Sequence, residues 1–513
     1  MAYVEDGSVF AQRRAACPGA AIVLALFGAT TSPAVAQSGP RSGAVTLSVP
    51  APPPAPFRIP APPPPPPRIA PTLTEAQAAL LRKMLADAPS HGIGTVEQAR
   101  ASQALSGAAL VNAALVHAVA LRGGSLSQTD YLKIWGLRPA FYEPWPSFVD
   151  AVARDRLAAW IAALPPPYTG YDNLRRGLAA YRAIVAKGGW ERLVEGTDLK
   201  PGAKGARVLA LRRRLAVEDS GVAAIGDSYD AELTDAVRRA QKRYGLEPTG
   251  SVGPQTLAAL NVPASERVGQ ILANMERWRW LPPELPTNRI QVNIAAAVLT
   301  VFSGDAPVLS MRAVTGRPGD ETPMLQSKIH SVVFNPPWNV PTSIATKELW
   351  PKERANPGYL ARNGFKVIKT PDGGSRLQQA AGDKSALGRF KFDFDNPYSV
   401  YLHDTPSQAT FDRYARMVSH GCVRLQRPAD LARLVLQGDE RWAGDAIDAT
   451  VAAGKTVRAK LPDPVSVYLL YWTAYASANG QMSFRADPYS WDSLLAARIE
   501  AKAAAPQFAT TAR

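Results

Sequence analysis

A histidine and a cysteine that follow strand-like stretches are the residues best suited to chemistry. His403 ends the candidate strand at residues 399–403, and Cys422 stands 19 positions further along. A cysteine is a good nucleophile as a thiolate, and a nearby imidazole that takes its proton can hold a thiolate–imidazolium pair. The separation is too long for one helical face but suits two neighbouring strands joined by a loop. The pair therefore predicts covalent catalysis with Cys422 as nucleophile and His403 as general base.

Residues next to the pair are suited to supporting it. Gly421 lets the backbone turn sharply, so that amide N–H groups near Cys422 can face a developing oxyanion. By the period of two, Tyr401 lies on the same strand face as His403, so its hydroxyl can reach the oxyanion or the substrate; a half-buried strand tyrosine is an equal alternative. The second imidazole nitrogen needs a partner, either Asp404 or a backbone carbonyl.

Twelve residues around this pair, 401–406 and 419–424, resemble the signature of the L,D-transpeptidases, the cysteine enzymes that cross-link peptidoglycan. The shared pattern is a histidine, a spacer of this length, then Ser-His-Gly-Cys with a hydrophobic and a polar residue. The resemblance implies that Cys422 attacks the carbonyl between the diamino acid at stem position three and D-alanine at position four. D-Alanine would leave, and the amine of a second stem peptide would resolve the thioester into a 3→3 cross-link. It also implies that no cofactor is used and that carbapenems acylate the enzyme.

The resemblance assigns roles to further residues. It gives the base role to the earlier histidine, so that His420 shapes the pocket; His420 as the base is the lesser alternative. It implies that the amides of Gly421 and Cys422 are oxyanion-hole donors and that Arg424 binds a stem-peptide carboxylate, although spacing alone also allows Arg424 to pair with an internal acid. Three further residues are expected to contact the substrate, the last two from a proline-braced loop: Ser419, Trp338 and Asn339.

Other functions are consistent with the same residues. Water as the acceptor would make the protein an L,D-carboxypeptidase, and an envelope protein as the acceptor would make it an attachment enzyme. A catalytically inactive peptidoglycan-binding scaffold is a further alternative, against which the presence of His403, Gly421 and Cys422 together argues. A zinc site at His403, His420 and Cys422 is disfavoured, because the sequence has five histidines and neither an HExxH element nor paired cysteines. We therefore expect no metal.

Composition favours a multidomain protein with an anionic partner. The chain has 513 residues, 46% hydrophobic content and a net charge of +15, which is enough apolar material for more than one core. Nucleic acid is disfavoured as a partner, because neither an aromatic-interleaved basic run nor a phosphate-cradling glycine loop is present. Peptidoglycan stem peptides and an anionic cell envelope fit better, and a charge that only maintains solubility is the alternative.

Residues 1–36 have the pattern of a signal peptide. A pair of arginines precedes an apolar stretch at residues 20–29, and residues 34–36 form an A-x-A cleavage site. We expect export to the periplasm; an uncleaved N-terminal anchor in the inner membrane is the alternative. Cleavage would remove Cys17 and leave Cys422 as the single cysteine, which in an exported protein indicates a reactive thiol or an intermolecular bridge.

The expected fold class is multidomain α+β. It combines a mainly β catalytic core of the L,D-transpeptidase type, a small three-helix domain and a helical scaffold. Residues 240–246 and 250–257 are similar to the peptidoglycan-binding module of many wall hydrolases. The expected order is a signal peptide (1–36), a proline-rich linker (37–72), the helical scaffold (73–198), the peptidoglycan-binding domain (199–264), a connector (265–288), the catalytic domain (289–486) with a lid-like insert (342–388), and a C-terminal helix and tail (487–513).

Local patterns place the elements within these domains. Thr74 and Gln77 predict a capping box before the first helix, and two tryptophans at Trp278 and Trp280 are expected to wedge domains together. Apolar periodicity predicts further helices at residues 96–121, 147–164, 172–187, 206–215, 233–244, 254–260 and 491–503. Alternation predicts strands at residues 290–294, 298–302, 311–315, 329–334, 388–394 and 399–403, and a hairpin within 465–485.

Overall fold

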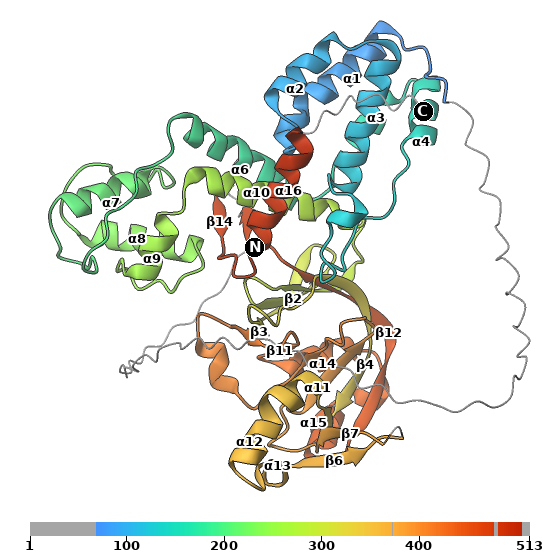
Figure 1. Ribbon diagram of the computed structural model, residues 1–513, viewed down its shortest axis with the longest axis vertical. Helices are drawn as coiled ribbons and strands as arrows, with labels where there is room; N and C mark the ends of the chain where they lie inside the picture. Colours follow the sequence, from blue (N-terminus) through green and yellow to red (C-terminus); the bar gives the residue numbers. More distant parts are fainter. Residues whose placement is uncertain (1–67, 372, 477–480, 505–513) are drawn as a thin grey trace, which may run out of the picture. The chain divides into compact units, whose positions relative to one another are not determined.

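The computed structural model describes residues 68–371, 373–476 and 481–504 (Figure 1). The described residues from Ala70 onward form one compact unit. The expected signal peptide and most of the expected proline-rich linker lie outside the described residues.

The scaffold expected at residues 73–198 is helical. Helix α1 (Glu75–Asp87) begins with the expected capping box, in which the Gln77 N–H donates to Thr74 Oγ1 at 3.2 Å and the Thr74 N–H donates to the Gln77 side chain at 3.1 Å. The single helix expected at 96–121 is wrong. It is divided into α2 (Val96–Ala101) and α3 (Gly107–Gly123) by a 3-10 turn and extended backbone at residues 105–106.

The helix expected at residues 147–164 is also interrupted. Helices α4 (Trp145–Ala153) and α5 (Leu157–Ala162) are separated at Asp155, which has a φ of 51°. A right-handed helix cannot pass through a residue with positive φ, so the chain changes direction there. Helix α6 (Thr169–Ala186) ends close to its predicted end, just before Gly188 and Gly189.

One described stretch, Gly107–Asp130, is long and apolar enough to cross a membrane by length and composition alone. Its α3 part packs with α1 and α4 in a helical core, to which it contributes Leu110, Val111, Ala114, Ala118 and Leu121. Core helices of soluble proteins pass the same test, so this stretch is weak evidence for a membrane span.

Three short helices form the module expected at residues 199–264. Helices α7 (Ala206–Ala216), α8 (Ala231–Arg243) and α9 (Pro254–Leu260) begin and end close to their predicted positions. Gln241 fixes the turn between α8 and α9, because its amide oxygen accepts the Gly250 N–H at 2.9 Å and its amide nitrogen donates to the Ser251 carbonyl at 2.8 Å. The sequence therefore predicted this module well.

Helix α10 (Ala264–Arg279) connects this module to the sheet that follows. The ring centroid of Trp280 lies 5.6 Å from that of Trp135 in the scaffold. Trp278 faces another way and stacks on Trp472 at a centroid distance of 4.7 Å. The two tryptophans thus join α10 to different parts of the chain, which confirms the expected wedge.

Nine described strands form one mixed sheet in the order β10-β3-β11-β9-β8-β4-β12-β1-β2. Because β2 also pairs with β3, the sheet closes on itself. The buried side of the sheet holds a large apolar core that includes Val332, Phe392 and Leu402. The strands are β1 (Asn288–Asn293), β2 (Val298–Ser303), β3 (Ala306–Gly316), β4 (Leu325–Phe334), β8 (Phe390–Phe394), β9 (Leu402–His403), β10 (Met417–Ser419), β11 (Val423–Leu425) and β12 (Val457–Leu470).

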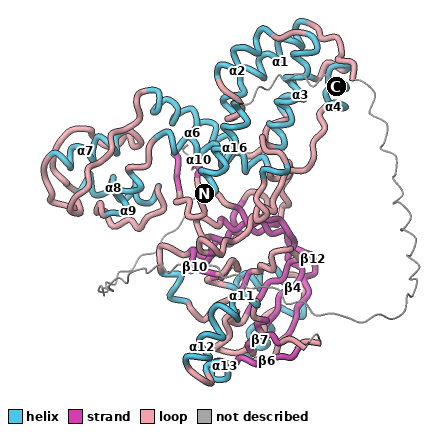
Figure 2. The backbone as a smooth tube through the Cα atoms, in the orientation of Figure 1, coloured by secondary structure: helices cyan, strands magenta, loops and turns pink. Residues whose placement is uncertain are grey.

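A smaller layer interrupts the large sheet between β4 and β8. It has a core of its own around Val340, Leu349, Leu360 and Leu377. Figure 2 shows two of its strands, β6 and β7, beside helices α12 and α13. The layer covers most of the expected lid-like insert, and its elements are β5 (Trp338–Asn339), α11 (Thr342–Ile344), the π-helical turn η4 (Ala345–Leu349), α12 (Trp350–Ala355), α13 (Tyr359–Arg362), β6 (Phe365–Lys369) and β7 (Ser375–Gln379).

The C-terminal segment returns to the helices. Strands β13 (Ala474–Ala476) and β14 (Met482–Phe484) pair as the expected hairpin, whose turn lies outside the described residues. Helix α16 (Trp491–Ala504) packs on α10, where Arg277 and Asp492 form a buried ion pair at 2.5 Å. Helix α14 (Pro428–Val435) follows β11.

Candidate active site

Two parallel strands bring the predicted pair onto one face of the sheet. Strand β9 pairs with β11 so that His403 lies opposite Arg424, and the Val423 N–H donates to the Tyr401 carbonyl at 3.1 Å. Val423 is fully buried in the core. Because side chains alternate along a strand, Tyr401, His403, Cys422 and Arg424 lie together on the opposite face.

Burial keeps the His403 imidazole neutral. Its Nδ1 lies 2.5 Å from the Asp404 carbonyl oxygen. Since a carbonyl only accepts, Nδ1 carries the hydrogen and Nε2 carries the lone pair. Burial lowers the pKa of His403 to about 3, and the nearby charge of Arg424 adds to the decrease.

The carboxylate of Asp404 does not orient the imidazole. It accepts the Arg389 N–H at 2.8 Å and the Thr405 N–H at 2.7 Å, so it stabilises the backbone just before β8 and just after β9. Of the two expected partners for the second nitrogen of His403, the structure therefore has the backbone carbonyl. The sequence could not distinguish them, because one residue supplies both groups.

Cys422 is a half-buried residue whose thiol is poorly solvated. Burial raises its pKa, while hydrogen bonds with Tyr401 and the charges of Lys391 and Arg424 oppose the increase. A raised thiol pKa beside a lowered imidazole pKa makes the neutral thiol and neutral imidazole the favoured resting forms. The expected preformed thiolate–imidazolium pair is not favoured, because both of its charges would be desolvated.

Tyr401 lies between the thiol and the insert. Its ring meets that of His403 edge-on, with a centroid distance of 5.6 Å. Burial raises the pKa of its hydroxyl, and so does a hydrogen bond with the Cys422 thiol; a hydrogen bond with Trp338 opposes the increase. The hydroxyl therefore contacts the predicted nucleophile directly, and its expected reach to the oxyanion or the substrate stays a prediction.

The turn that carries Cys422 is closed by Ser419. The Ser419 hydroxyl donates to the Cys422 carbonyl at 2.6 Å and accepts the Gly421 N–H at 3.2 Å. Ser419 is 1% exposed, so its expected contact with substrate is wrong; the residue supports the turn instead. Gly421 has a φ of 102°, which explains why glycine stands there. Its N–H donates to the Ser419 hydroxyl within the turn, whereas the sequence predicted this N–H to be an oxyanion-hole donor.

His420 contacts the insert rather than the thiol. Its Nε2 lies 2.6 Å from the Glu348 carboxylate on η4 and 3.0 Å from an Arg317 nitrogen. Arg317 also pairs with Asp320 at 2.8 Å. This geometry is consistent with the expected pocket-shaping role and leaves the imidazole engaged away from Cys422.

Arg424 is a half-buried cation beside the predicted pair. Burial lowers the pKa of Arg424, and the charge interaction with Cys422 opposes this decrease. Within the described part of the chain, no acidic side chain forms an ion pair with it, and its Nε is buried without a hydrogen-bond partner. The alternative of an internal acid for Arg424 is therefore wrong for the described residues.

The two predicted groove residues lie in β5 of the insert. Trp338 contacts the Tyr401 hydroxyl through a hydrogen bond and packs beside Phe365 at a centroid distance of 6.3 Å. Asn339 is exposed, and its side-chain oxygen accepts from Gln378 at 2.8 Å. Trp338 thus lies at the site, whereas Asn339 belongs to the edge of the insert.

Sequence reasoning missed a row of charged side chains on the face of the sheet that carries His403 and Cys422. Lys391 of β8 lies opposite His403, and its Nζ is 4.4 Å from the Tyr401 ring centroid. The Asp393 carboxylate joins Lys391 and Arg458, each at 2.7 Å. Alternation along residues 390–394 could have placed Lys391 and Asp393 on one face, but not which other strand they would meet.

No three histidine, cysteine, aspartate or glutamate side chains converge as a possible metal site among the residues that the structure describes. His420 points to Glu348, so the three candidate zinc ligands of the sequence are not brought together there.

Two parts of the chain match known protein families. Residues 287–451 match the model described as "L,D-transpeptidase catalytic domain", and residues 204–260 match the model described as "Putative peptidoglycan binding domain". The first match contains β1 to β11 and the insert, and the second contains the three helices α7 to α9.

The chain is also similar to a curated protein and to solved structures. A protein of Haemophilus influenzae named "Putative L,D-transpeptidase" is 33% identical over 259 residues, which cover 46% of this chain and 52% of that protein. The match thus spans about half the length of this curated relative. Among solved structures, similarity extends to an L,D-transpeptidase from Stackebrandtia nassauensis (16% identity, 54% of this chain, 97% of that chain, TM-score 0.23) and one from Xylanimonas cellulosilytica (17%, 54%, 99%, 0.19).

Proposed function

We propose that this chain, in which residues 287–451 form an L,D-transpeptidase catalytic domain and residues 204–260 a peptidoglycan-binding domain, makes 3→3 cross-links in peptidoglycan. The observation that carries the proposal is the parallel register of β9 and β11, which puts His403 and Cys422 on one face. A nucleophile and a base that are held by adjacent strands meet the requirement for covalent acyl transfer.

The neutral resting pair defines the first step. Cys422 Sγ attacks the carbonyl that joins the diamino acid to D-alanine, and its proton passes to His403 Nε2 as the S–C bond forms. The carbonyl oxygen becomes an oxyanion near the Cys422 N–H. Collapse of this intermediate breaks the C–N bond, and the proton on His403 leaves with the amine of D-alanine. A thioester on Cys422 remains.

The second step repeats this proton transfer with another substrate. The amine of a second stem peptide attacks the thioester and loses a proton to His403, and Cys422 leaves as the thiol. Because His403 has a pKa of about 3, its neutral form is available at physiological pH to accept both protons. No step needs ATP or a cofactor, since the peptide bond that is broken supplies the acyl group.

The charges around the pair suit an acidic peptide. Arg424 has no ion-pair partner among the described residues, so a stem-peptide carboxylate could supply the missing anion. Lys391 adds a second cation beside Tyr401. Trp338 provides an apolar surface next to the thiol.

The acceptor distinguishes the alternatives. An amine acceptor gives the cross-link, water gives an L,D-carboxypeptidase, and an envelope protein gives an attachment enzyme. The insert favours an amine, because Trp338 and the His420–Glu348 contact place it against the nucleophile turn, where it would limit the access of water. We place the enzyme in the periplasm, as the signal-peptide pattern of residues 1–36 predicts, with an anchor in the inner membrane as the alternative.

One experiment tests the proposal. Purified protein is incubated with tetrapeptide-containing muropeptides, and D-alanine release and 3→3 dimers are quantified by mass spectrometry. We expect both products with the wild type and neither with Cys422→Ala. Intact mass after treatment with a carbapenem should show one adduct that Cys422→Ala lacks. Release of D-alanine without dimers would support the carboxypeptidase instead, and cross-linking by Cys422→Ala would refute the mechanism.

A further inference from the structure

A fully buried threonine holds the peptide bond that precedes the predicted nucleophile. Thr322 lies in the loop between β3 and β4 and is 0% exposed. Its Oγ1 donates to the Gly421 carbonyl at 2.8 Å and accepts the Gly316 N–H at 2.8 Å. A carbonyl can only accept and an amide N–H can only donate, so the single hydroxyl hydrogen must point at Gly421.

A tyrosine from the C-terminal segment holds this threonine in turn. The Tyr489 hydroxyl accepts the Thr322 N–H at 3.2 Å and donates to the Gly316 carbonyl at 2.5 Å. Thr322 and Tyr489 thus form a closed set of hydrogen bonds around Gly316. Tyr489 lies beyond residue 451, where the match to the catalytic-domain family ends.

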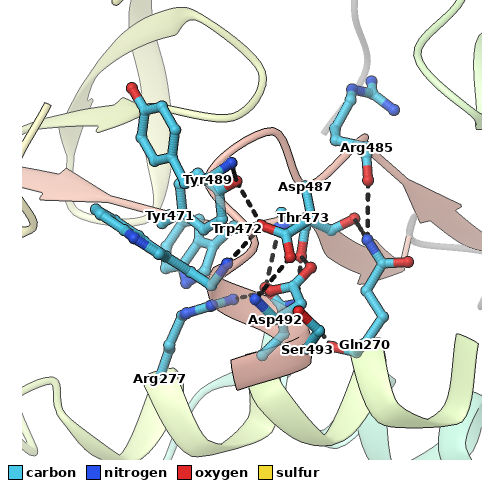
Figure 3. Close-up of polar contacts among 12 residues, drawn as sticks. Gln270, Arg277, Tyr471, Trp472, Thr473, Arg485, Asp487, Tyr489, Asp492 and Ser493 are labelled. Carbon is cyan, nitrogen blue, oxygen red and sulfur yellow. Dashed lines mark hydrogen bonds and ion pairs between the residues drawn. The ribbon is translucent and has the colours of Figure 1, made fainter. Parts of the chain in front are cut away.

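The position of Tyr489 is itself fixed by aromatic and polar contacts. Its ring stacks on Tyr471 at a centroid distance of 5.2 Å and an interplanar angle of 15°. The Tyr471 hydroxyl donates to Asp487 at 2.7 Å, and Asp487 accepts the N–H groups of Trp491 and Asp492 at the start of α16. Figure 3 shows Tyr489, Tyr471 and Asp487 together with Asp492 and its partner Arg277. Tyr489 therefore belongs to a rigid junction rather than to a free loop.

Peptide geometry gives this arrangement a consequence at Cys422. The peptide unit is planar and trans, so the C=O of Gly421 and the N–H of Cys422 point in opposite directions. Because Thr322 Oγ1 fixes the direction of the carbonyl, it also fixes the direction of the Cys422 N–H, away from Thr322. The neighbouring Gly421 N–H is held by Ser419, so the Cys422 amide is the donor whose direction these bonds set.

We propose that Thr322 and Tyr489 are positioning residues, which hold the Gly421–Cys422 peptide so that the Cys422 N–H stabilises the oxyanion of the reaction. This inference rests on the proposed acyl-transfer function. It predicts that the two hydroxyls matter for attack on a carbonyl but not for reactions of the thiol that form no oxyanion. The segment after residue 451 is then needed for catalysis and not only for packing.

Two reactions of the same thiol separate this role from a structural one. Acylation by a carbapenem passes through an oxyanion, whereas alkylation by iodoacetamide displaces iodide and does not. We expect Tyr489→Phe and Thr322→Val each to slow acylation roughly 10- to 100-fold, which is at or below the effect of removing an oxyanion donor. The rate of alkylation should stay at the wild-type value, and Thr322→Ser, which keeps the hydroxyl, should restore acylation.

Tyr398→Phe is the matched control. It removes a hydroxyl that donates to the Lys133 carbonyl at 2.7 Å, and it should leave both rates unchanged. Tyr489→Phe keeps the ring that stacks on Tyr471, so it carries the test by itself if Thr322→Val does not fold. Wild-type acylation rates in both variants, or an equal decrease of acylation and alkylation, would overturn the inference. A wild type that is alkylated but neither acylated nor able to release D-alanine would overturn the proposed function and this inference with it.

Discussion

At His403, burial decides which form of the imidazole meets the thiol. Placing a charge in this poorly solvated position costs free energy, so the ring binds a proton only when the thiol gives one up during attack. The hydrogen bond from Nδ1 to the Asp404 carbonyl then stabilises the imidazolium as it forms. The proton would thus stay on sulfur until a carbonyl arrives, which protects the thiol from oxidation because the thiolate is the reactive form.

The pH dependence of acylation follows from this burial. The pKa of His403 is lowered to about 3, so the base stays neutral as the pH falls from about 8 to about 5, and we expect no loss of the carbapenem acylation rate from its protonation. Rates measured across this range with the wild type and with His403→Gln test the prediction; the variant should be slow throughout. A half-maximal decrease near pH 6.5, the ordinary histidine pKa, would contradict it.

Substitution of Arg424 should weaken the binding of one substrate carboxylate. A hydrogen bond to a charged group contributes about 1.5 to 3 kcal/mol, so Arg424→Gln should raise the KM for a stem peptide roughly 10- to 100-fold. The exposed Arg413→Gln should change little. If Arg424 binds a carboxylate, a stem peptide with that group amidated should bind the wild type and Arg424→Gln equally weakly. If the wild type still binds the amidated stem peptide more tightly than Arg424→Gln does, Arg424 has another role.

Among the elements, the sequence predicted those whose pattern is local. The capping box at Thr74 and the helices of the module at residues 204–260 were predicted well, because each depends on residues within one turn or one amphipathic face. The helix breaks at residues 105–106 and at Asp155 were missed. Gly107, which has a φ of 52°, follows the first break directly and was a local signal that the apolar periodicity concealed. No glycine or proline adjoins Asp155, so tertiary packing overrides the local helical pattern there.

The candidate site likewise contains residues that local patterns predicted and residues that they did not. His403, Tyr401 and Cys422 were singled out because their motif lies in two short stretches of sequence and their strand face follows from alternation. Lys391 enters through the pairing of β8 with β9, and Tyr489 through a segment more than sixty residues after the cysteine. Strand register and long-range hydrogen bonds are not encoded in local periodicity, so no pattern in this sequence could have supplied them.

The insert should be held against the nucleophile turn by a small polar contact. Glu348 accepts from His420 at 2.6 Å and lies 3.6 Å from Arg317. We expect Glu348→Ala to increase amide hydrogen exchange at residues 342–355, because it removes this contact. Lys347→Ala, at an exposed neighbouring position, leaves the contact in place and is the control. A looser insert should also raise the ratio of hydrolysis to cross-linking. Identical exchange in both variants would show that the insert is held by its apolar contacts alone.

At the scale of the whole molecule, α10 joins separate parts of the chain through buried side chains. Arg277 and Asp492 are 2% and 7% exposed, and their ion pair at 2.5 Å connects α10 to α16. Removing one partner of such a pair leaves a buried charge without compensation, at a cost of about 3 to 5 kcal/mol. Arg277→Met should therefore lower the free energy of unfolding by about this amount, measured by chemical denaturation.

A second substitution separates the ion pair from packing. Adding Asp492→Leu to Arg277→Met removes the charge that the single change left unpaired, so the double variant should recover part of the lost stability. If the two substitutions are additive, the pair is not coupled and the junction depends on its aromatic contacts instead. In either case α10 would be a stability element that the sequence identified only through its two tryptophans.

Acid should destabilise the whole chain through its buried histidines. The pKa of His91 is lowered to about 3 and that of His117 to about 4, mainly by burial, as for His403. The unfolded chain binds protons below about pH 6.5 and the folded chain does not, so the free energy of unfolding falls as the pH decreases, by about 1.4 kcal/mol per unit for each such residue. His117→Gln should reduce this slope in urea denaturation between about pH 6.5 and pH 4.5. His330→Gln, which removes a half-exposed imidazole outside the helical core, is the control substitution. An unchanged slope in His117→Gln would mean that acid acts through carboxylates rather than through the helical core.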